Sequence, residues 1–230
     1  MENILLEEQD QVLLITINRE KQLNALNKST IEELSSALDD AAQNDSIRSV
    51  VITGSGGKAF VAGADIKEFA SFSVEQGKAL AAEGQTKLFN KVEKMNKPVI
   101  AAINGFALGG GLELAMAAHM RVASDNARMG LPEVSLGVIP GYGGTQRLAQ
   151  LVGKGKALEL ITSAGMIKAP EALNWGLVNY VVPLDELIAK AKEMASATHR
   201  NSPVAIKAAI KAVLAGYETG TDGLEREIEL

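Results

Sequence analysis

The sequence predicts an α/β fold in which pairs of short strands alternate with helices. Two runs of apolar and β-branched residues, Ser49–Thr53 and Pro98–Ile103, are typical of strands buried on both faces. The order strand–strand–helix recurs, which indicates parallel pairing without a clean alternation of one strand and one helix. From Gly143 onward the pattern is mostly helical, with one further strand expected at Leu177–Val182.

The length, the net charge and the cysteine and histidine counts of the chain exclude or disfavour several classes of function. The chain has 230 residues, of which 47% are hydrophobic and 22% charged, enough for one large domain or a core with a small appendage. A net charge of −5 argues against binding to nucleic acid or to a membrane surface. The absence of cysteine excludes disulfides, thiolate nucleophiles and zinc–thiolate sites, and the two histidines disfavour an imidazole-based metal site or a serine–histidine triad. We expect a cytoplasmic protein, because the N-terminus does not resemble a signal peptide and no apolar run is long enough to span a bilayer.

The N-terminal elements can be placed from local signals. Strands at Ile4–Glu8 and Val12–Ile17 form a predicted hairpin. A helix is predicted to begin near Ser29, because Ser29 and Glu32 have the spacing of a capping box. One apolar stripe follows at helical spacing: Ile31, Leu34, Leu38 and Ala41.

Later elements follow the same logic. The pattern predicts a short strand at Ala59–Ala62, a long helical segment at about Val74–Met95 and a strand at Arg121–Ser124. Ser202 and Pro203 are a typical helix start, with serine as cap and proline in the first turn. We therefore expect an α/β core over residues 1–183 and a helical C-terminal region over residues 184–230.

Glu113 is the strongest functional signal. It is the only charged side chain between Lys97 and Arg121, and it follows three glycines at the head of an apolar helical stretch. A carboxylate in such surroundings is expected to be buried, which is costly unless it has a function. Glu133 also lies between apolar residues and precedes a second glycine-rich loop. Each residue alone could be a helix-terminal or surface carboxylate, but two of them beside flexible backbone indicate acid–base chemistry.

Two glycine-rich segments offer backbone N–H groups. One interpretation of Gly109–Gly111 is close packing of a helix on a strand. The other, which we favour, is that N–H groups at the start of the helix bind an oxyanion. The loop Gly63–Asp65 could supply another N–H. By contrast, Gly54–Lys58 fails as a dinucleotide-binding fingerprint, because Phe60 and the residue after it indicate a strand where a helix is required. His119 and Trp175 are interpreted as structural.

Several blocks of sequence resemble the crotonases, the enoyl-CoA hydratase/isomerase superfamily. The resemblance covers nearly the whole chain. It is strongest at Ala62–Lys67, Ala101–Ala115, Pro132–Glu133 and Gly137–Leu148.

The resemblance implies a spiral of strand–strand–helix units, a helical C-terminal part used in trimer formation, and a coenzyme A thioester as substrate. The N–H groups of Ala64 and Gly110 would form the oxyanion hole. Glu113 would activate water at the β-carbon, and Glu133 would deliver the proton to the α-carbon. Further contacts with the coenzyme would come from a set of residues on three loops: Leu23, Ala64, Asp65, Ile66, Lys67 and Gly141.

The resemblance therefore implies reversible hydration of a 2-enoyl-CoA without a metal or separate cofactor, by a homotrimer or a dimer of trimers. A double-bond isomerase is the alternative among enzymes, and a non-catalytic or RNA-binding relative is the alternative of another class. Members that only isomerise often keep one carboxylate, so the presence of both favours hydration. Relatives continue beyond Leu230 for roughly one more helical hairpin. We therefore expect a truncated chain with a weaker grip on the coenzyme.

Overall fold

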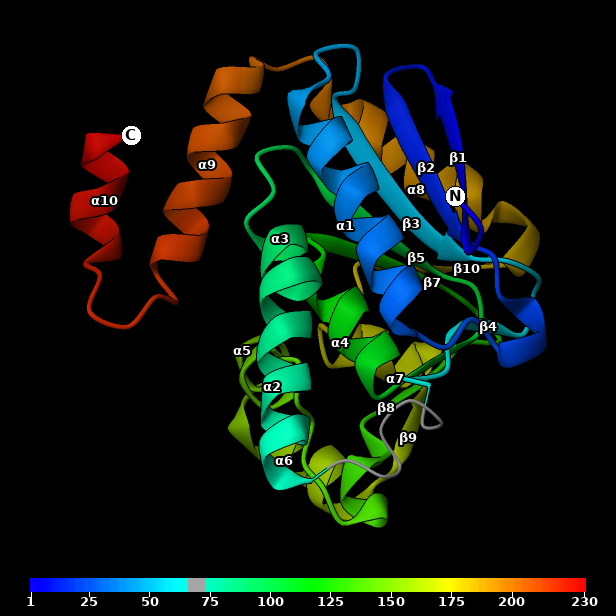
Figure 1. The fold of residues 1–230 in the computed structure, drawn as a ribbon. Helices are drawn as coiled ribbons and strands as arrows, with labels where there is room; N and C mark the ends of the chain where they lie inside the picture. Colours follow the sequence, from blue (N-terminus) through cyan, green and yellow to red (C-terminus); the bar gives the residue numbers. More distant parts are fainter. Residues whose placement is uncertain (66–72) are drawn as a thin grey trace.

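The computed structural model describes residues 1–65 and 73–230. Two sheets lie at the centre, with helices around them and an arm of two helices that extends away from the rest (Figure 1). The larger sheet has six strands in the order β1-β2-β3-β5-β7-β10. Their bounds are Ile4–Gln9, Val12–Ile17, Ser49–Gly54, Val99–Ile103, Met120–Ser124 and Tyr180–Val182.

The pairing confirms the predicted hairpin and the predicted parallel sheet. β1 pairs with β2 antiparallel, and every following pair in this sheet is parallel. The last strand is shorter than expected, because residues 177–179 are irregular and the paired strand begins only at Tyr180. Parallel neighbours require crossover connections, and these connections carry the helices and the second sheet.

Burial on both faces explains why β3 and β5 contain so few polar residues. Alternate residues of β3 point to opposite faces, so that Val50 joins the main core and Val51 a second apolar cluster. The main core includes α1 (Lys28–Gln43). The second cluster is closed by Leu187 and neighbouring apolar residues of α8 (Leu187–Thr198). α8 therefore covers the sheet face opposite α1.

The second sheet was only partly predicted. Its order is β4-β6-β8-β9, with bounds Ala59–Val61, Phe106–Leu108, Arg128–Gly130 and Met166–Lys168. Only the first of these was expected. The others have three residues each, too short for a periodicity to emerge.

The start of α1 differs from the prediction. Asn27, not Ser29, is the N-cap, and its side chain accepts a hydrogen bond from Thr30 N at 2.8 Å. Ser29 lies inside the first turn, so the predicted capping box with Glu32 is wrong. The apolar stripe of this helix is nevertheless buried as predicted.

The long helical segment is interrupted. α2 (Val74–Gly84) begins with a capping box of Ser73 and Gln76 and leads into a π-helical turn at Gln85–Phe89. α3 (Asn90–Glu93) completes the segment. π-Helical turns are uncommon and recur near functional sites.

The remaining helices complete the chain. α4 (Gly110–Ala117), α5 (Gly144–Val152), α6 (Lys154–Ser163) and α7 (Ala169–Asn174) lie near the second sheet (Figure 1). Short 3-10 turns occupy Glu20–Gln22, Pro132–Leu136 and Leu184–Glu186.

The C-terminal arm consists of α9 (Pro203–Ala215) and α10 (Gly223–Glu229). Ser202 caps α9 as predicted, by accepting a hydrogen bond from Ala205 N. The apolar face of α9 is only partly covered, because Ile206 and Ile210 are half-buried and Val213 is exposed. Among the helices in the described part of the chain, none has the length and apolar character needed to cross a membrane.

Candidate active site

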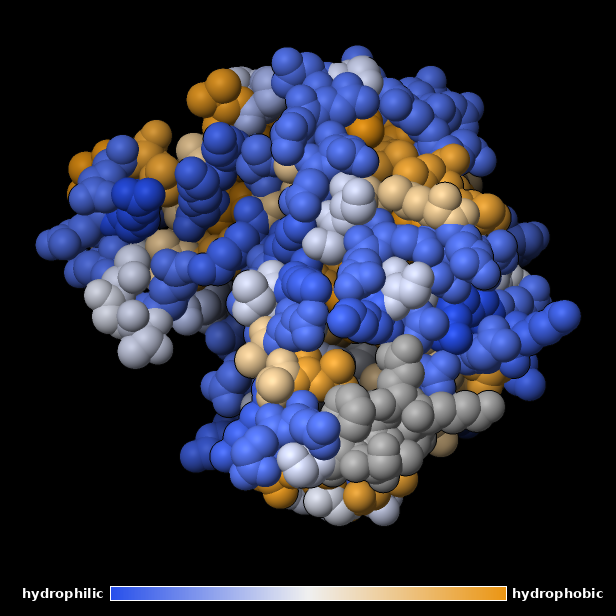
Figure 2. Space-filling view, in the orientation of Figure 1, coloured by the Kyte–Doolittle hydropathy of each residue, from blue (hydrophilic) through white to orange (hydrophobic). Residues whose placement is uncertain are grey.

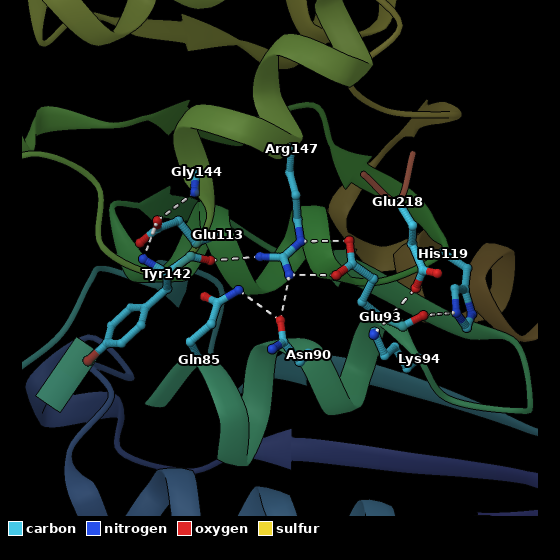
Figure 3. Close-up of polar contacts among 10 residues, drawn as sticks. All are labelled: Gln85, Asn90, Glu93, Lys94, Glu113, His119, Tyr142, Gly144, Arg147 and Glu218. Carbon is cyan, nitrogen blue, oxygen red and sulfur yellow. Dashed lines mark hydrogen bonds and ion pairs between the residues drawn. The ribbon is translucent and has the colours of Figure 1, made fainter. Parts of the chain in front are cut away.

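Glu113 lies in the first turn of α4 and is buried, with 1% of its surface exposed. Its Oε1 atom accepts hydrogen bonds from Tyr142 N at 2.8 Å and Gly144 N at 2.7 Å (Figure 3). Two N–H groups that converge on one anionic oxygen form a backbone nest. The expectation of a buried carboxylate is therefore confirmed, and its partners come from the second glycine-rich loop.

The ionisation of Glu113 reflects opposing effects. Burial is the largest and raises the pKa of Glu113 to about 7, with a further upward contribution from the charge of Glu133. Hydrogen bonds from Gly144 N and Tyr142 N and the positive charge of Arg147 lower it. A carboxyl with such a pKa can gain or lose a proton near neutral pH, as an acid–base catalyst requires.

Glu133 lies in the 3-10 turn Pro132–Leu136, which follows β8. The side chain is half-buried, and burial raises the pKa of its carboxyl. Its Oε2 atom is buried and has no hydrogen-bond partner among the described residues. Its Oε1 lies 2.8 Å from the position that a Cβ on Gly109 would take. The carboxyl is therefore beside the start of α4, with one oxygen left for another group.

The glycines before Glu113 have different roles. A Cβ on Gly111 would lie 2.0 Å from Val61 O, so this glycine allows α4 to pack directly on β4. A Cβ on Gly110 would meet nothing closer than 3.5 Å, and Ala64 N would be 3.7 Å away. Packing accounts for Gly111 but not for Gly110, which faces the second predicted donor.

Two N–H groups near this point are not used by the secondary structure. Gly110 is the first residue of α4, so its N–H has no partner inside the helix. Ala64 forms an isolated bridge with Leu26, in which Leu26 N donates to Gly63 O and Asp65 N donates to Leu26 O. The bridge leaves the Ala64 N–H out. Neither the helix nor the bridge therefore uses these two N–H groups.

The other predicted binding residues are distributed around the same region. Leu23 has a left-handed backbone, and its carbonyl accepts from Ala62 N, which ties the segment to the strand end before Ala64. Asp65 forms an ion pair with Arg19 at 3.2 Å. Gly141 is exposed beside α2. Ile66 and Lys67 lie outside the described residues.

His119 is structural, as interpreted from the sequence. Its Nδ1 accepts from Val99 N and its Nε2 donates to Glu93 O, both at 3.0 Å, and burial lowers the pKa of the ring. Trp175 is partly buried against the main core. Within residues 1–65 and 73–230, histidine and carboxylate side chains form no group of three or more that could hold a metal ion.

Two residues behind the site, Arg147 and Glu93, were not predicted as site residues. Arg147 is buried at 5% exposure, and its guanidinium donates to both carboxylate oxygens of Glu93 and to the carbonyl of Tyr142. Glu93 ends a helix 54 positions away in the chain, so no spacing pattern could have predicted the contact.

Comparisons with known proteins agree with this geometry. The model of the family described as enoyl-CoA hydratase/isomerase matches residues 7–230. The short-chain-enoyl-CoA hydratase of Clostridium acetobutylicum is 47% identical over 96% of this chain and 85% of its own length. The crotonyl-CoA hydratase of Syntrophomonas wolfei is 45% identical with the same coverage.

Solved structures give the same result. A crystal structure of enoyl-CoA hydratase from Bacillus anthracis superposes with a TM-score of 0.93 and 42% identity, over 99% of this chain and 89% of that one. The predicted fold class, the spiral α/β fold of the crotonases, is therefore confirmed. The chain belongs to the enoyl-CoA hydratase/isomerase family.

Proposed function

We propose that the protein hydrates 2-enoyl-CoA thioesters reversibly, giving 3-hydroxyacyl-CoA by syn addition of water. The observation that carries the proposal is the pair Glu113 and Glu133, two buried or half-buried carboxyls with raised pKa values beside the amides of Ala64 and Gly110. The names of the relatives, short-chain-enoyl-CoA and crotonyl-CoA hydratase, support short acyl chains.

The chemistry follows from where charge develops. Attack of water at the β-carbon moves negative charge to the thioester oxygen, and the N–H groups of Ala64 and Gly110 would stabilise that charge. Loss of one such donor typically costs about 3 kcal/mol of transition-state stabilisation. Glu113, as the carboxylate, takes the proton from water while its Oε1 stays on the two loop N–H groups. Glu133, as the acid, gives its proton to the α-carbon. Carboxyls in unlike environments can hold the two protonation states that this division requires.

No redox step and no metal enters this reaction, since a proton acceptor, a proton donor and an oxyanion hole suffice. The coenzyme A is part of the substrate. The proposal has the enzyme in the cytoplasm, which the lack of cysteine supports because disulfides are features of oxidising compartments.

The test is a screen of thioesters by absorbance of the conjugated double bond. Purified protein is mixed with crotonyl-CoA, with longer 2-enoyl-CoA esters and, in reverse, with 3-hydroxyacyl-CoA. We expect loss of absorbance with crotonyl-CoA and gain with 3-hydroxybutyryl-CoA. A 3-enoyl-CoA that is converted while crotonyl-CoA is not would instead identify an isomerase.

We also propose that the enzyme is a homotrimer, or a dimer of trimers, with residues 184–230 as the assembly region on a core of residues 1–183. The exposed apolar side chains of the C-terminal arm support this. Figure 2 shows hydrophobic surface on the arm, away from the core. The most exposed are Val204, Val213, Leu224 and Ile228. Such a surface on a soluble enzyme usually marks an interface.

A further inference from the structure

The position of Glu113 depends on a loop rather than on its own helix. Both hydrogen bonds to its Oε1 come from the N–H groups of Tyr142 and Gly144, which flank Gly143. If this loop changes shape, the carboxylate loses both partners at once. Whatever fixes the loop therefore fixes the proposed base.

Arg147 fixes the loop from behind. Its Nη1 donates to Tyr142 O at 2.7 Å, which holds the peptide between the two N–H donors (Figure 3). Gly143 makes the turn with φ +88°, and a Cβ there would lie 2.3 Å from Arg147 Nη1. The glycine therefore leaves room for the guanidinium, which any side chain at position 143 would have to displace.

Glu93 in turn holds Arg147. Its two oxygens accept from Arg147 Nε at 2.9 Å and Nη2 at 2.7 Å, a bidentate pair that fixes the guanidinium plane as well as its place. The backbone carbonyl of Glu93 accepts from His119, which is itself bound to Val99 N of β5. This series of hydrogen bonds thus begins at the central sheet and ends at the two loop N–H groups that donate to Glu113.

We propose that Arg147 and Glu93 are a positioning pair, which holds the N–H groups of Tyr142 and Gly144 on the Glu113 carboxylate. The inference rests on the proposed hydratase function. The pair acts through the loop, because the guanidinium is buried and its N–H groups donate to Glu93, Tyr142 O and Asn90.

The pair has an electrostatic consequence that distinguishes positioning from mere packing. In the described chain, the ionisable groups that act on Glu113 are Glu133, in the 3-10 turn, which raises its pKa, and Arg147, in α5, which lowers it. Glu93, in α3, faces the far side of Arg147. Loss of Arg147 removes its charge and loosens two hydrogen bonds that also lower the pKa of Glu113. The pKa of Glu113 should therefore rise.

The experiment measures crotonyl-CoA hydration by Arg147→Lys, Arg147→Gln and Glu93→Gln from about pH 5.5 to about pH 9. For Arg147→Gln we expect kcat to fall about tenfold or more, as small misplacements of a catalytic group can cause, with KM changed less than about threefold. The acid limb of kcat/KM should move to higher pH. Arg147→Lys should have a smaller fall in kcat than Arg147→Gln, because lysine keeps the positive charge but cannot form the bidentate pair.

Lys94→Gln is the matched control. It removes an exposed ion pair with Glu218, one residue beyond Glu93 (Figure 3), and should leave kcat, KM and the acid limb unchanged. Folding is followed by circular dichroism and molecular mass. If Arg147→Gln does not fold, Glu93→Gln tests the pair through kcat alone, because it keeps the side-chain volume and the charge of Arg147.

Folded variants with an unmoved acid limb and wild-type kcat would overturn the inference. A loss of activity that is fully explained by the fraction of unfolded protein would also overturn the inference. Failure of the proposed function is a separate result, since the wild-type protein itself would then not hydrate crotonyl-CoA.

Discussion

The contacts that stabilise the charged form of Glu113 do not fully offset its burial. Two backbone N–H groups and Arg147 favour the carboxylate, but burial outweighs them and raises the pKa of Glu113 to about 7. The sequence could indicate this residue, because an isolated charge in an apolar helix is visible without a structure. It could not indicate the loop donors or Arg147, which lie 29 or more positions away and are brought close only by the fold.

The raised pKa of Glu113 predicts that the free energy of unfolding depends on pH. In the unfolded chain Glu113 ionises near its ordinary pKa of about 4.3. Below that pH the residue is neutral in both states and costs nothing. As pH rises to about 7 the unfolded state loses the proton first, so the free energy of unfolding falls, by roughly 4 kcal/mol in all.

Glu113→Gln should therefore stabilise the protein more at pH 8 than at pH 4.5. Urea unfolding of both proteins at the two pH values checks this. Glu186→Gln, an exposed glutamate of the 3-10 turn Leu184–Glu186, is the control. An equal effect of Glu113→Gln at both values would mean that Glu113 ionises normally in the folded protein.

At the scale of elements, the strands of the large sheet could be predicted because each has five or six mostly apolar residues, except the last. Of the second sheet only β4 was predicted, since β6, β8 and β9 have three residues each and show no periodicity. The start of α1 was misplaced because serine and asparagine are both good caps, and only the structure shows that Asn27 makes the hydrogen bond.

The start of α4 allows a paired test of packing and function. Gly111→Ala would place a methyl group 2.0 Å from Val61 O, so we expect it to destabilise the fold by more than about 3 kcal/mol. Gly110→Ala meets no contact shorter than 3.5 Å and should fold normally. Its methyl group would nevertheless point toward Ala64 N, within the proposed oxyanion hole, and should lower kcat at least about tenfold.

Thermal unfolding and crotonyl-CoA hydration of the two variants separate the effects. A stable, fully active Gly110→Ala protein would remove Gly110 from the proposed site. A Gly111→Ala protein of wild-type stability would show that α4 does not pack on β4 as described.

At the scale of the whole molecule, the most exposed large apolar side chain of the described residues lies on the C-terminal arm. Leu224 and Ile228 of α10 are 76% and 87% exposed. The sequence predicted a helical C-terminal region, but it could not show that these side chains lack a partner within the described core.

This arm predicts a dependence of assembly on α10. Light scattering should give the mass of a trimer or hexamer for the wild-type protein and a lower mass for Leu224→Glu with Ile228→Glu, because two buried charges would face the neighbouring subunit. Leu5→Glu, on the edge strand β1, should keep the wild-type mass. A monomeric wild-type protein would contradict the proposed assembly.

The most direct test of the whole account is the turnover of Glu113→Gln and Glu133→Gln with crotonyl-CoA. Each substitution keeps the side-chain size and removes the group that takes or gives the proton. We predict that each lowers kcat at least about a hundredfold in folded protein. Near-normal turnover in both variants would contradict the assignment of these two glutamates as base and acid.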